Sequence, residues 1–115
     1  AGTAGGGVTL DGTVDTNGGD FTINTPGNVT QSAAFTAGAL SLLGGGSFTL
    51  TNAGNSFASL TATATTASLV NSNATTSFGT VSTTGAFTFD TTGTVTQAAN
   101  ATLSATTVIL SPVEV

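Results

Sequence analysis

Apolar residues and threonine alternate in short runs along the whole chain. The triplets VTL, FTI, FTL, FTF and VIL begin at Val8, Phe21, Phe48, Phe87 and Val108. Successive side chains of an extended strand point to opposite faces, so an apolar–Thr–apolar triplet presents two apolar side chains on one face. The residues between the triplets are mostly Gly, Thr, Ser and Asn, which disfavour helix interiors. The pattern therefore predicts short β-strands and no helices.

The last residues of the strands recur at a nearly regular interval. These core anchors are Ile23, Leu50, Leu69, Phe89 and Leu110, separated by 27, 19, 20 and 21 residues. Self-similarity at such a period is typical of a solenoid, in which each coil packs on the next. We predict an all-β fold, a right-handed parallel β-helix of roughly five coils of about 19–27 residues. An antiparallel sandwich would explain the frequent turn signals but not this register.

The predicted solenoid is a single segment over residues 1–115, with a flexible Gly-rich start at 1–7 and a short C-terminal end at 111–115. Four residues after the first four anchors the chain has Gly27, Gly54, Asn73 and Gly93. Gly and Asn enter the left-handed region at least cost, so this structural turn column predicts left-handed corners. Asn52 and Asn71 lie two residues after their anchors, where they either form a ladder between coils or cap the turns locally.

One stretch of the chain recurs as an internal repeat. Residues 12–31 read GTVDTNGGDFTINTPGNVTQ, and residues 79–97 read GTVSTTGAFTFDTTGTVTQ. The apolar triplets, the turn glycines and the VTQ endings are kept, whereas Asp15 and Asp20 are replaced by Ser82 and Ala86. Because both segments retain the apolar and turn residues, we predict one strand–corner–strand module that is used twice, about three coils apart.

Charge and chemistry narrow the function. The chain has no Lys, Arg, His, Cys or Tyr, and its ionisable side chains are Asp11, Asp15, Asp20, Asp90 and Glu114. Without cations a nucleic-acid partner is not expected, and no apolar run is long enough for membrane insertion. No Ser–His, Cys–His or Lys-based nucleophile can be assembled, so we expect no enzyme, no catalytic residues and no cofactor. Polysaccharide cleavage by paired carboxylates is the remote alternative.

Two other candidate activities depend on surface side chains. Asp11, Asp15 and Asp20 are the candidate calcium ligands, although solvated turn aspartates are the favoured interpretation because the second copy lacks two of them. The stretch TATATT, Thr61 to Thr66, suggests a threonine face like that of ice-binding solenoids, which is the alternative function. The scatter of threonine along the chain and the unequal intervals argue against such a face.

Residues 8–110 resemble a known family. The steps GNVTQ, LTNAGN and AGALSL are similar to the repeat region of filamentous-haemagglutinin-type exoproteins of two-partner secretion. The resemblance implies a β-helical shaft at the surface of a Gram-negative cell that serves in adhesion, biofilm formation or contact-dependent competition, with a glycan or protein receptor.

We therefore expect an extracellular structural protein, either the shaft of an adhesin-like exoprotein or the subunit of a surface or matrix fibre. Solenoid ends are open sheet edges unless they are capped. The expected partners are accordingly a second copy, bound end-to-end or laterally, or an adjoining solenoid of a longer chain.

Overall fold

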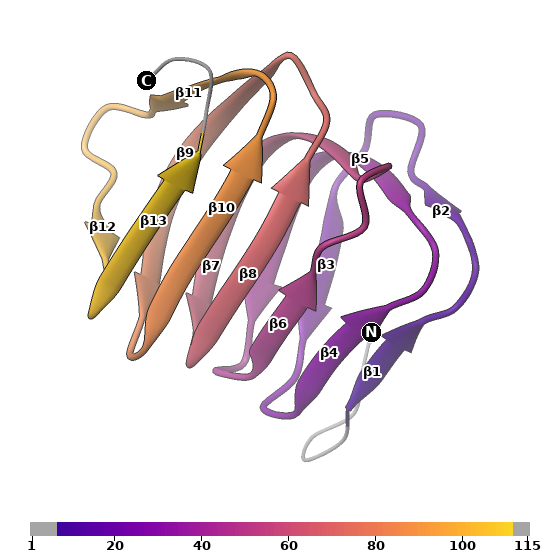
Figure 1. The fold of residues 1–115 in the computed structure, drawn as a ribbon, viewed down its shortest axis with the longest axis horizontal. Helices are drawn as coiled ribbons and strands as arrows, with labels where there is room; N and C mark the ends of the chain where they lie inside the picture. Colours follow the sequence, from indigo (N-terminus) through magenta and orange to yellow (C-terminus); the bar gives the residue numbers. More distant parts are fainter. Residues whose placement is uncertain (1–6, 112–115) are drawn as a thin grey trace.

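The computed structural model describes residues 7–111, which form β-strands and no helix. Most of the predicted start at 1–7 and end at 111–115 lies outside these residues. The strands make two parallel sheets (Figure 1). Sheet A contains, in order, β1 (Val8–Leu10), β4 (Asn28–Gln31), β6 (Ser47–Leu50), β8 (Thr66–Asn71), β10 (Ala86–Thr91) and β13 (Thr107–Ser111). Sheet B contains β2 (Val14–Asp15), β3 (Phe21–Asn24), β5 (Phe35–Leu43), β7 (Ser56–Ala64), β9 (Thr75–Thr83), β11 (Thr94–Gln97) and β12 (Leu103–Ser104).

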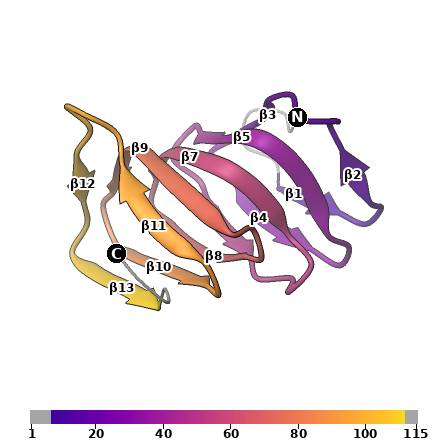
Figure 2. The same cartoon turned by 90° about the horizontal axis from the view of Figure 1, so that it is seen from above.

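The chain alternates between the two sheets and so winds into stacked coils (Figure 2). In the three central coils one long strand, β5, β7 or β9, spans sheet B. In the first and last coils two shorter strands replace it: β2 and β3 pair with β5, and β11 and β12 pair with β9. The predicted all-β solenoid of about five coils is confirmed.

The register of sheet A measures the length of each coil. Paired positions run from Val8 through Val29, Phe48, Ala67 and Phe87 to Val108, so successive coils take 21, 19, 19, 20 and 21 residues. The 27-residue coil expected from the sequence does not exist. It arose because Ile23 belongs to sheet B, where it pairs with Leu42, whereas Leu50, Leu69, Phe89 and Leu110 pair with one another in sheet A.

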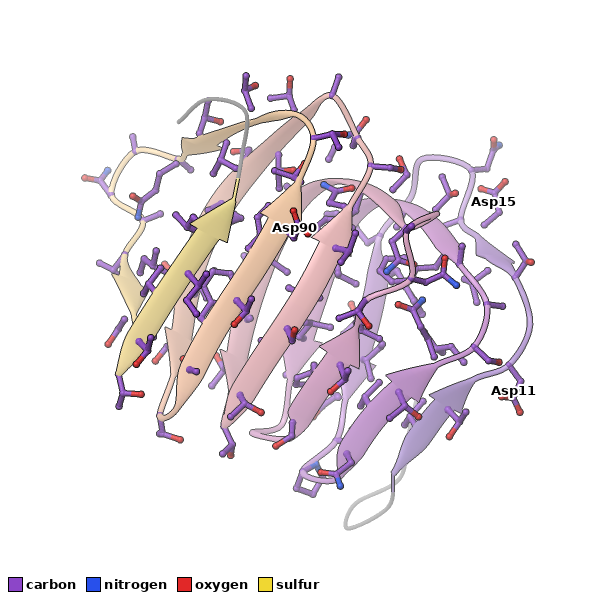
Figure 3. All side chains as sticks on the ribbon, in the orientation of Figure 1. Asp11, Asp15 and Asp90 are labelled. Carbon is purple, nitrogen blue, oxygen red and sulfur yellow. The ribbon has the colours of Figure 1, made fainter. Side chains whose placement is uncertain are left out.

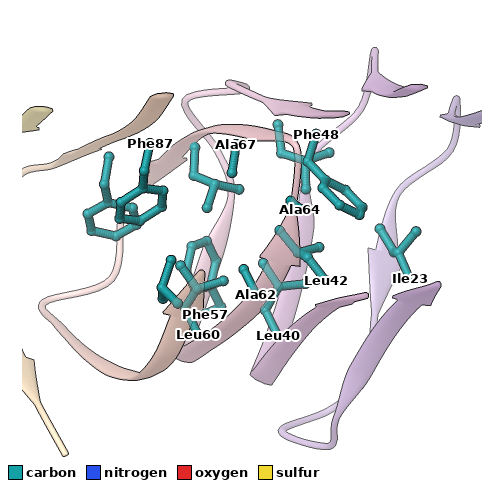
Figure 4. Packing of buried hydrophobic residues seen from close by; sticks show 14 of the residues in the cluster. Ile23, Leu40, Leu42, Phe48, Phe57, Leu60, Ala62, Ala64, Ala67 and Phe87 are labelled. Carbon is teal, nitrogen blue, oxygen red and sulfur yellow. The ribbon is translucent and has the colours of Figure 1, made fainter. Parts of the chain in front are cut away.

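Inward-facing side chains from both sheets form one core along the coil axis (Figure 4). Ile23, Leu50, Leu69 and Phe89 are buried, and Leu110 is half-buried in the last strand. Alternation in the strands places these residues inward, and each fully buried Leu, Ile or Phe stabilises the fold by about 1.5–3 kcal/mol relative to exposure.

Phenylalanine rings link different coils inside this core. The rings of Phe35 and Phe57 stack with centroids 5.8 Å apart, and those of Phe78 and Phe89 meet edge to face at 5.0 Å. Phe57 in turn contacts Phe89, with centroids 6.1 Å apart. Such pairs add about 0.5–1.5 kcal/mol beyond area burial, so the rings stabilise the stacking of coils as well as each coil.

The corners are built differently from the prediction. Among the described residues, positive φ occurs at Asn17, Gly18, Gly44, Gly45 and Asn100, so the prediction of left-handed corners at Gly27, Gly54, Asn73 and Gly93 is wrong.

Each of those four residues instead makes the same kind of hydrogen bond. The backbone N–H of each donates to the side-chain oxygen of the residue two places earlier, at 2.9–3.1 Å; the acceptors are Thr25, Asn52, Asn71 and Thr91. A side-chain acceptor that closes a turn in this way needs no left-handed residue. Glycine matters at Gly93 for another reason, because a Cβ there would overlap the Ala74 carbonyl of the coil below.

Candidate functional site

The candidate calcium ligands lie in the first coil but do not form a cluster. Asp11 accepts a hydrogen bond from the Ser32 hydroxyl at 3.2 Å, and Asp15 accepts one from the backbone N–H of Asn17 at 2.8 Å. Asp20 is exposed just before β3, and Asp90 lies in β10, apart from Asp11 and Asp15 (Figure 3). Within residues 7–111, no three acidic side chains are grouped closely enough to hold a metal ion. Asp15 therefore serves as a local hydrogen-bond acceptor, and Asp11 accepts a hydrogen bond from the second coil.

The surface formed by the described residues is not hollowed into a pocket. The interior between the sheets is filled by the apolar core, and the buried side-chain polar atoms of the described residues all have hydrogen-bond partners. No helix in this part of the chain could span a membrane. The candidate functional features are consequently the corner that leads from sheet A to sheet B, the outer face of sheet A, and the two ends of the solenoid.

A buried amide cluster forms the corner that leads from sheet A to sheet B. Gln31 and Asn55 are joined by two hydrogen bonds: Gln31 Nε2 donates to Asn55 Oδ1 at 2.8 Å, and Asn55 Nδ2 donates to Gln31 Oε1 at 2.7 Å. The Asn52 backbone N–H also donates to Gln31 Oε1, at 3.0 Å. Asn55 accepts from the Phe35 N–H and donates to the Leu50 carbonyl. These contacts tie the second coil to the third.

The same corner continues through Asn71. Its Oδ1 accepts from the N–H of Phe57 at 3.0 Å, and its Nδ2 donates to the Phe57 carbonyl at 2.8 Å and to the Thr76 hydroxyl at 2.6 Å. Asn52 and Asn71 do not bond to each other; Asn52 caps its own turn, and Asn71 caps its turn while also binding the coil below. Fully satisfied buried polar groups of this kind hold neighbouring backbones in one arrangement.

Sequence reasoning missed Gln31 and Asn55, the centre of this cluster. One signal was available: Gln31 pairs with Leu10 in an inward column where the later coils carry Leu50, Leu69 and Phe89. A glutamine in an apolar column requires hydrogen-bond partners. The sequence does not indicate which of the many asparagines supplies it.

Hydroxyl groups line the outer face of sheet A. Thr9 pairs with Thr30, and Thr49 pairs with Ser68, which pairs with Thr88. The pairing of Val29 with Phe48 continues the column from Thr30 to Thr49. All five side chains are exposed or half-buried, and they stand one strand spacing apart, about 4.8 Å. Sheet A thus carries a ladder of four threonines and one serine. Thr61 and Thr63 of the TATATT stretch lie exposed in β7 of sheet B, so the threonines occupy both sheets, in line with the scatter seen in the sequence.

The two ends of the stack differ from its middle. The free edges of sheet A are β1 and β13 among the described strands. Val108 belongs to the inward column of Val29, Phe48, Ala67 and Phe87, yet 42% of its surface is exposed, against 2% or less for those four. Val8 and Leu10 at the other end are half-buried. Each end therefore presents apolar core residues beside an unpaired strand edge.

These features define a repeat-built β-solenoid whose side-chain chemistry serves packing between coils. Residues 1–64 match a family described as repeats of unknown function (DUF5649), and the chain belongs to that family. The comparisons with curated proteins and with solved structures produced no match.

Proposed function

We propose that this chain is a structural module, the shaft of an adhesin-like exoprotein at the bacterial cell surface. The observation that carries the proposal is the continuous parallel pairing of sheet A from β1 to β13, accompanied by coil-to-coil pairing in sheet B that has one register shift, between β7 and β9. A ladder of this kind resists bending because displacement of one coil would break several backbone hydrogen bonds together.

The shaft would act as a spacer. Each coil uses 19–21 residues and advances the stack by one strand spacing, about 4.8 Å, so length is set by the number of repeats. The amide cluster and the phenylalanine contacts lock neighbouring coils together. Surface location and adhesion are supported by the resemblance to filamentous-haemagglutinin-type repeats. The interior formed by residues 7–111 is filled and their surface has no pocket, which supports a structural role over catalysis or small-molecule binding.

An antibody raised against the folded chain tests the proposal. On intact cells of the bacterium that produces the protein, immunogold label should lie outside the outer membrane, and deletion of residues 7–111 should reduce cell adhesion. Replacement of the same residues by a flexible Gly-Ser linker of equal length is the matched control, and it should fail to restore adhesion. Label confined to the cytoplasm, or full adhesion with the linker, contradicts the proposal.

Ice binding is a second candidate, favoured by the threonine column on sheet A. Regularly spaced hydroxyl and methyl groups on a sparsely charged face are the feature shared with ice-binding solenoids. We expect thermal hysteresis in the parent chain and its loss in Thr49→Lys, whereas Thr61→Lys on sheet B should retain it. Absence of thermal hysteresis in the parent excludes this function and leaves the shaft proposal intact.

A further inference from the structure

We infer that the ends of the solenoid bind each other, so that the β13 edge of one copy pairs with the β1 edge of a second copy. This inference rests on the proposed function as a shaft, which it extends from one chain to a filament. The interface would continue, in sheet A, the parallel strand pairing that already runs from β1 to β13.

The first observation is the match between the two edges of sheet A. Val8 starts the inward column that Val108 ends, and Leu10 lies in the same inward register as Leu110. Pairing of β13 with β1 would place Val108 beside Val8 and Leu110 beside Leu10. Both columns would then be apolar across the junction, and the 42% exposure of Val108 would fall toward the values of the inner coils.

The two ends of sheet B have the same layout but do not meet in this pairing. At one end β2 and β3 cover the first and second parts of β5, and at the other end β11 and β12 cover the same parts of β9. Sheet A has one strand more than sheet B has layers, because β13 ends the stack without a described partner layer in sheet B. With β13 on β1, β11 and β12 therefore stand two strand spacings, about 9.6 Å, from β2 and β3, and sheet A alone makes the contact.

Charge favours the same partner and predicts a salt effect. Neither β1 nor β13 contains an ionisable residue, so no charge is buried by the pairing. Each copy nevertheless carries a net charge of −5 with no cation, and two copies repel each other. Salt screens such repulsion, with a Debye length of about 30 Å at 0.01 M and about 3 Å at 1 M. Stacking should therefore strengthen as salt is added.

The symmetry of the contact determines which type of assembly forms. The two edges are different surfaces, so the interface is heterologous, and repeated head-to-tail pairing gives an open filament rather than a closed dimer. Unpaired strand edges are templates for such pairing unless they are blocked.

Sedimentation velocity of the purified chain, at increasing concentration in about 0.01 M and about 1 M salt, tests the inference. We expect oligomers that grow with concentration and salt, and short rods that lengthen in negative-stain images. Val108→Asp and Val8→Asp should each abolish growth. Ile109→Asp and Thr9→Asp, which add the same charge to the outward face of the same strands, should retain it.

A mixture of the two inactive variants gives the sharpest result. Val8→Asp keeps an intact β13 edge and Val108→Asp keeps an intact β1 edge, so an equimolar mixture should form dimers and nothing larger. Circular dichroism checks that each variant is folded, and Val108→Thr, which retains the β-branched shape, should weaken association without abolishing it.

A parent chain that stays monomeric in both salt concentrations overturns the inference, as does an Ile109→Asp variant as defective as Val108→Asp or a mixture that stays monomeric. The purified chain reports on stacking and the intact cells report on the shaft role, so failure of one proposal is distinguishable from failure of the other.

Discussion

Residues 12–31 and 79–97 have nearly the same sequence but occupy different parts of the coil. Phe21 of the first copy lies in sheet B, whereas its counterpart Phe87 lies in sheet A. Three coils after Phe21 the same column holds Phe78, reached through Leu40 and Leu60, so Phe87 comes nine residues too late. The prediction that the two copies are the same module three coils apart is therefore wrong about position.

The local structure of the two copies is nonetheless the same. In the first, the Gly27 N–H donates to Thr25 Oγ1, and in the second, the Gly93 N–H donates to Thr91 Oγ1, both at 3.1 Å. The first turn leads from sheet B to sheet A and the second from sheet A to sheet B. The comparison teaches that one strand–corner–strand sequence can form either of the two corners of the coil. Each corner joins two strands that have the same alternation of apolar and polar residues.

The largest expected difference between the copies concerns their first phenylalanine. Phe87 is fully buried and Phe21 is half-buried in the first coil. Truncation of a buried Phe to Ala costs about 3–5 kcal/mol, so we expect Phe87→Ala to lower the free energy of unfolding by that amount and Phe21→Ala by roughly half. Urea denaturation measures both. Equal losses would show that the first coil is packed as tightly as the fifth.

The next largest difference in stability is expected between variants of the glutamines that end the two copies, Gln31 and Gln97. Gln31 is bound to Asn55, Asn52 and Ala33, whereas Gln97 is exposed and its amide donates to the Ala101 carbonyl at 2.9 Å. Gln31→Leu leaves part-buried polar groups without partners, which costs about 1–3 kcal/mol. Gln97→Leu should change stability by less than about 0.5 kcal/mol. A thermal melt in which the two variants behave alike would argue against the amide cluster.

The first glycines of the copies offer a smaller contrast. A Cβ on Gly79 would lie 2.5 Å from the Thr61 methyl group, whereas a Cβ on Gly12 would meet nothing within 4 Å. We expect Gly79→Ala to destabilise by about 1 kcal/mol and Gly12→Ala to stabilise by about 0.4–1 kcal/mol. The double variant Gly79→Ala, Thr61→Ser, which removes the methyl group, should recover stability in the same denaturation assay; no recovery would rule out this clash as the cause.

The smallest effect is expected where the copies differ in charge. Asp15→Ser and Asp20→Ala give the first copy the residues of the second, Ser82 and Ala86. Because the aspartates are exposed and ungrouped, each change should alter stability by less than about 0.5 kcal/mol. The melting temperature of the parent should be the same in calcium and in chelator. A calcium-dependent rise in the parent that Asp15→Ser removes would establish a metal site.

The solenoid and most of its core were predictable from the sequence. Leu50, Leu69 and Phe89 were recognised as one column because apolar alternation and a recurring interval carry that information directly. The amide cluster was predictable only in part. Asn52 and Asn71 stood out by their spacing, but the partner of Gln31 did not, since Asn55 is 24 residues away and is selected by the stacking of coils.

By itself the sequence determined local structure: which residues are extended, where the chain turns, and that the coils repeat at about 20 residues. These properties depend on neighbours within a few positions, such as Thr91 and Gly93. Only the tertiary structure decided which sheet each strand joins, which threonines share a face, and which core residues stay exposed at β13. Those outcomes depend on the accumulated length of all preceding coils, so two nearly identical segments, 12–31 and 79–97, lie at opposite corners of one solenoid.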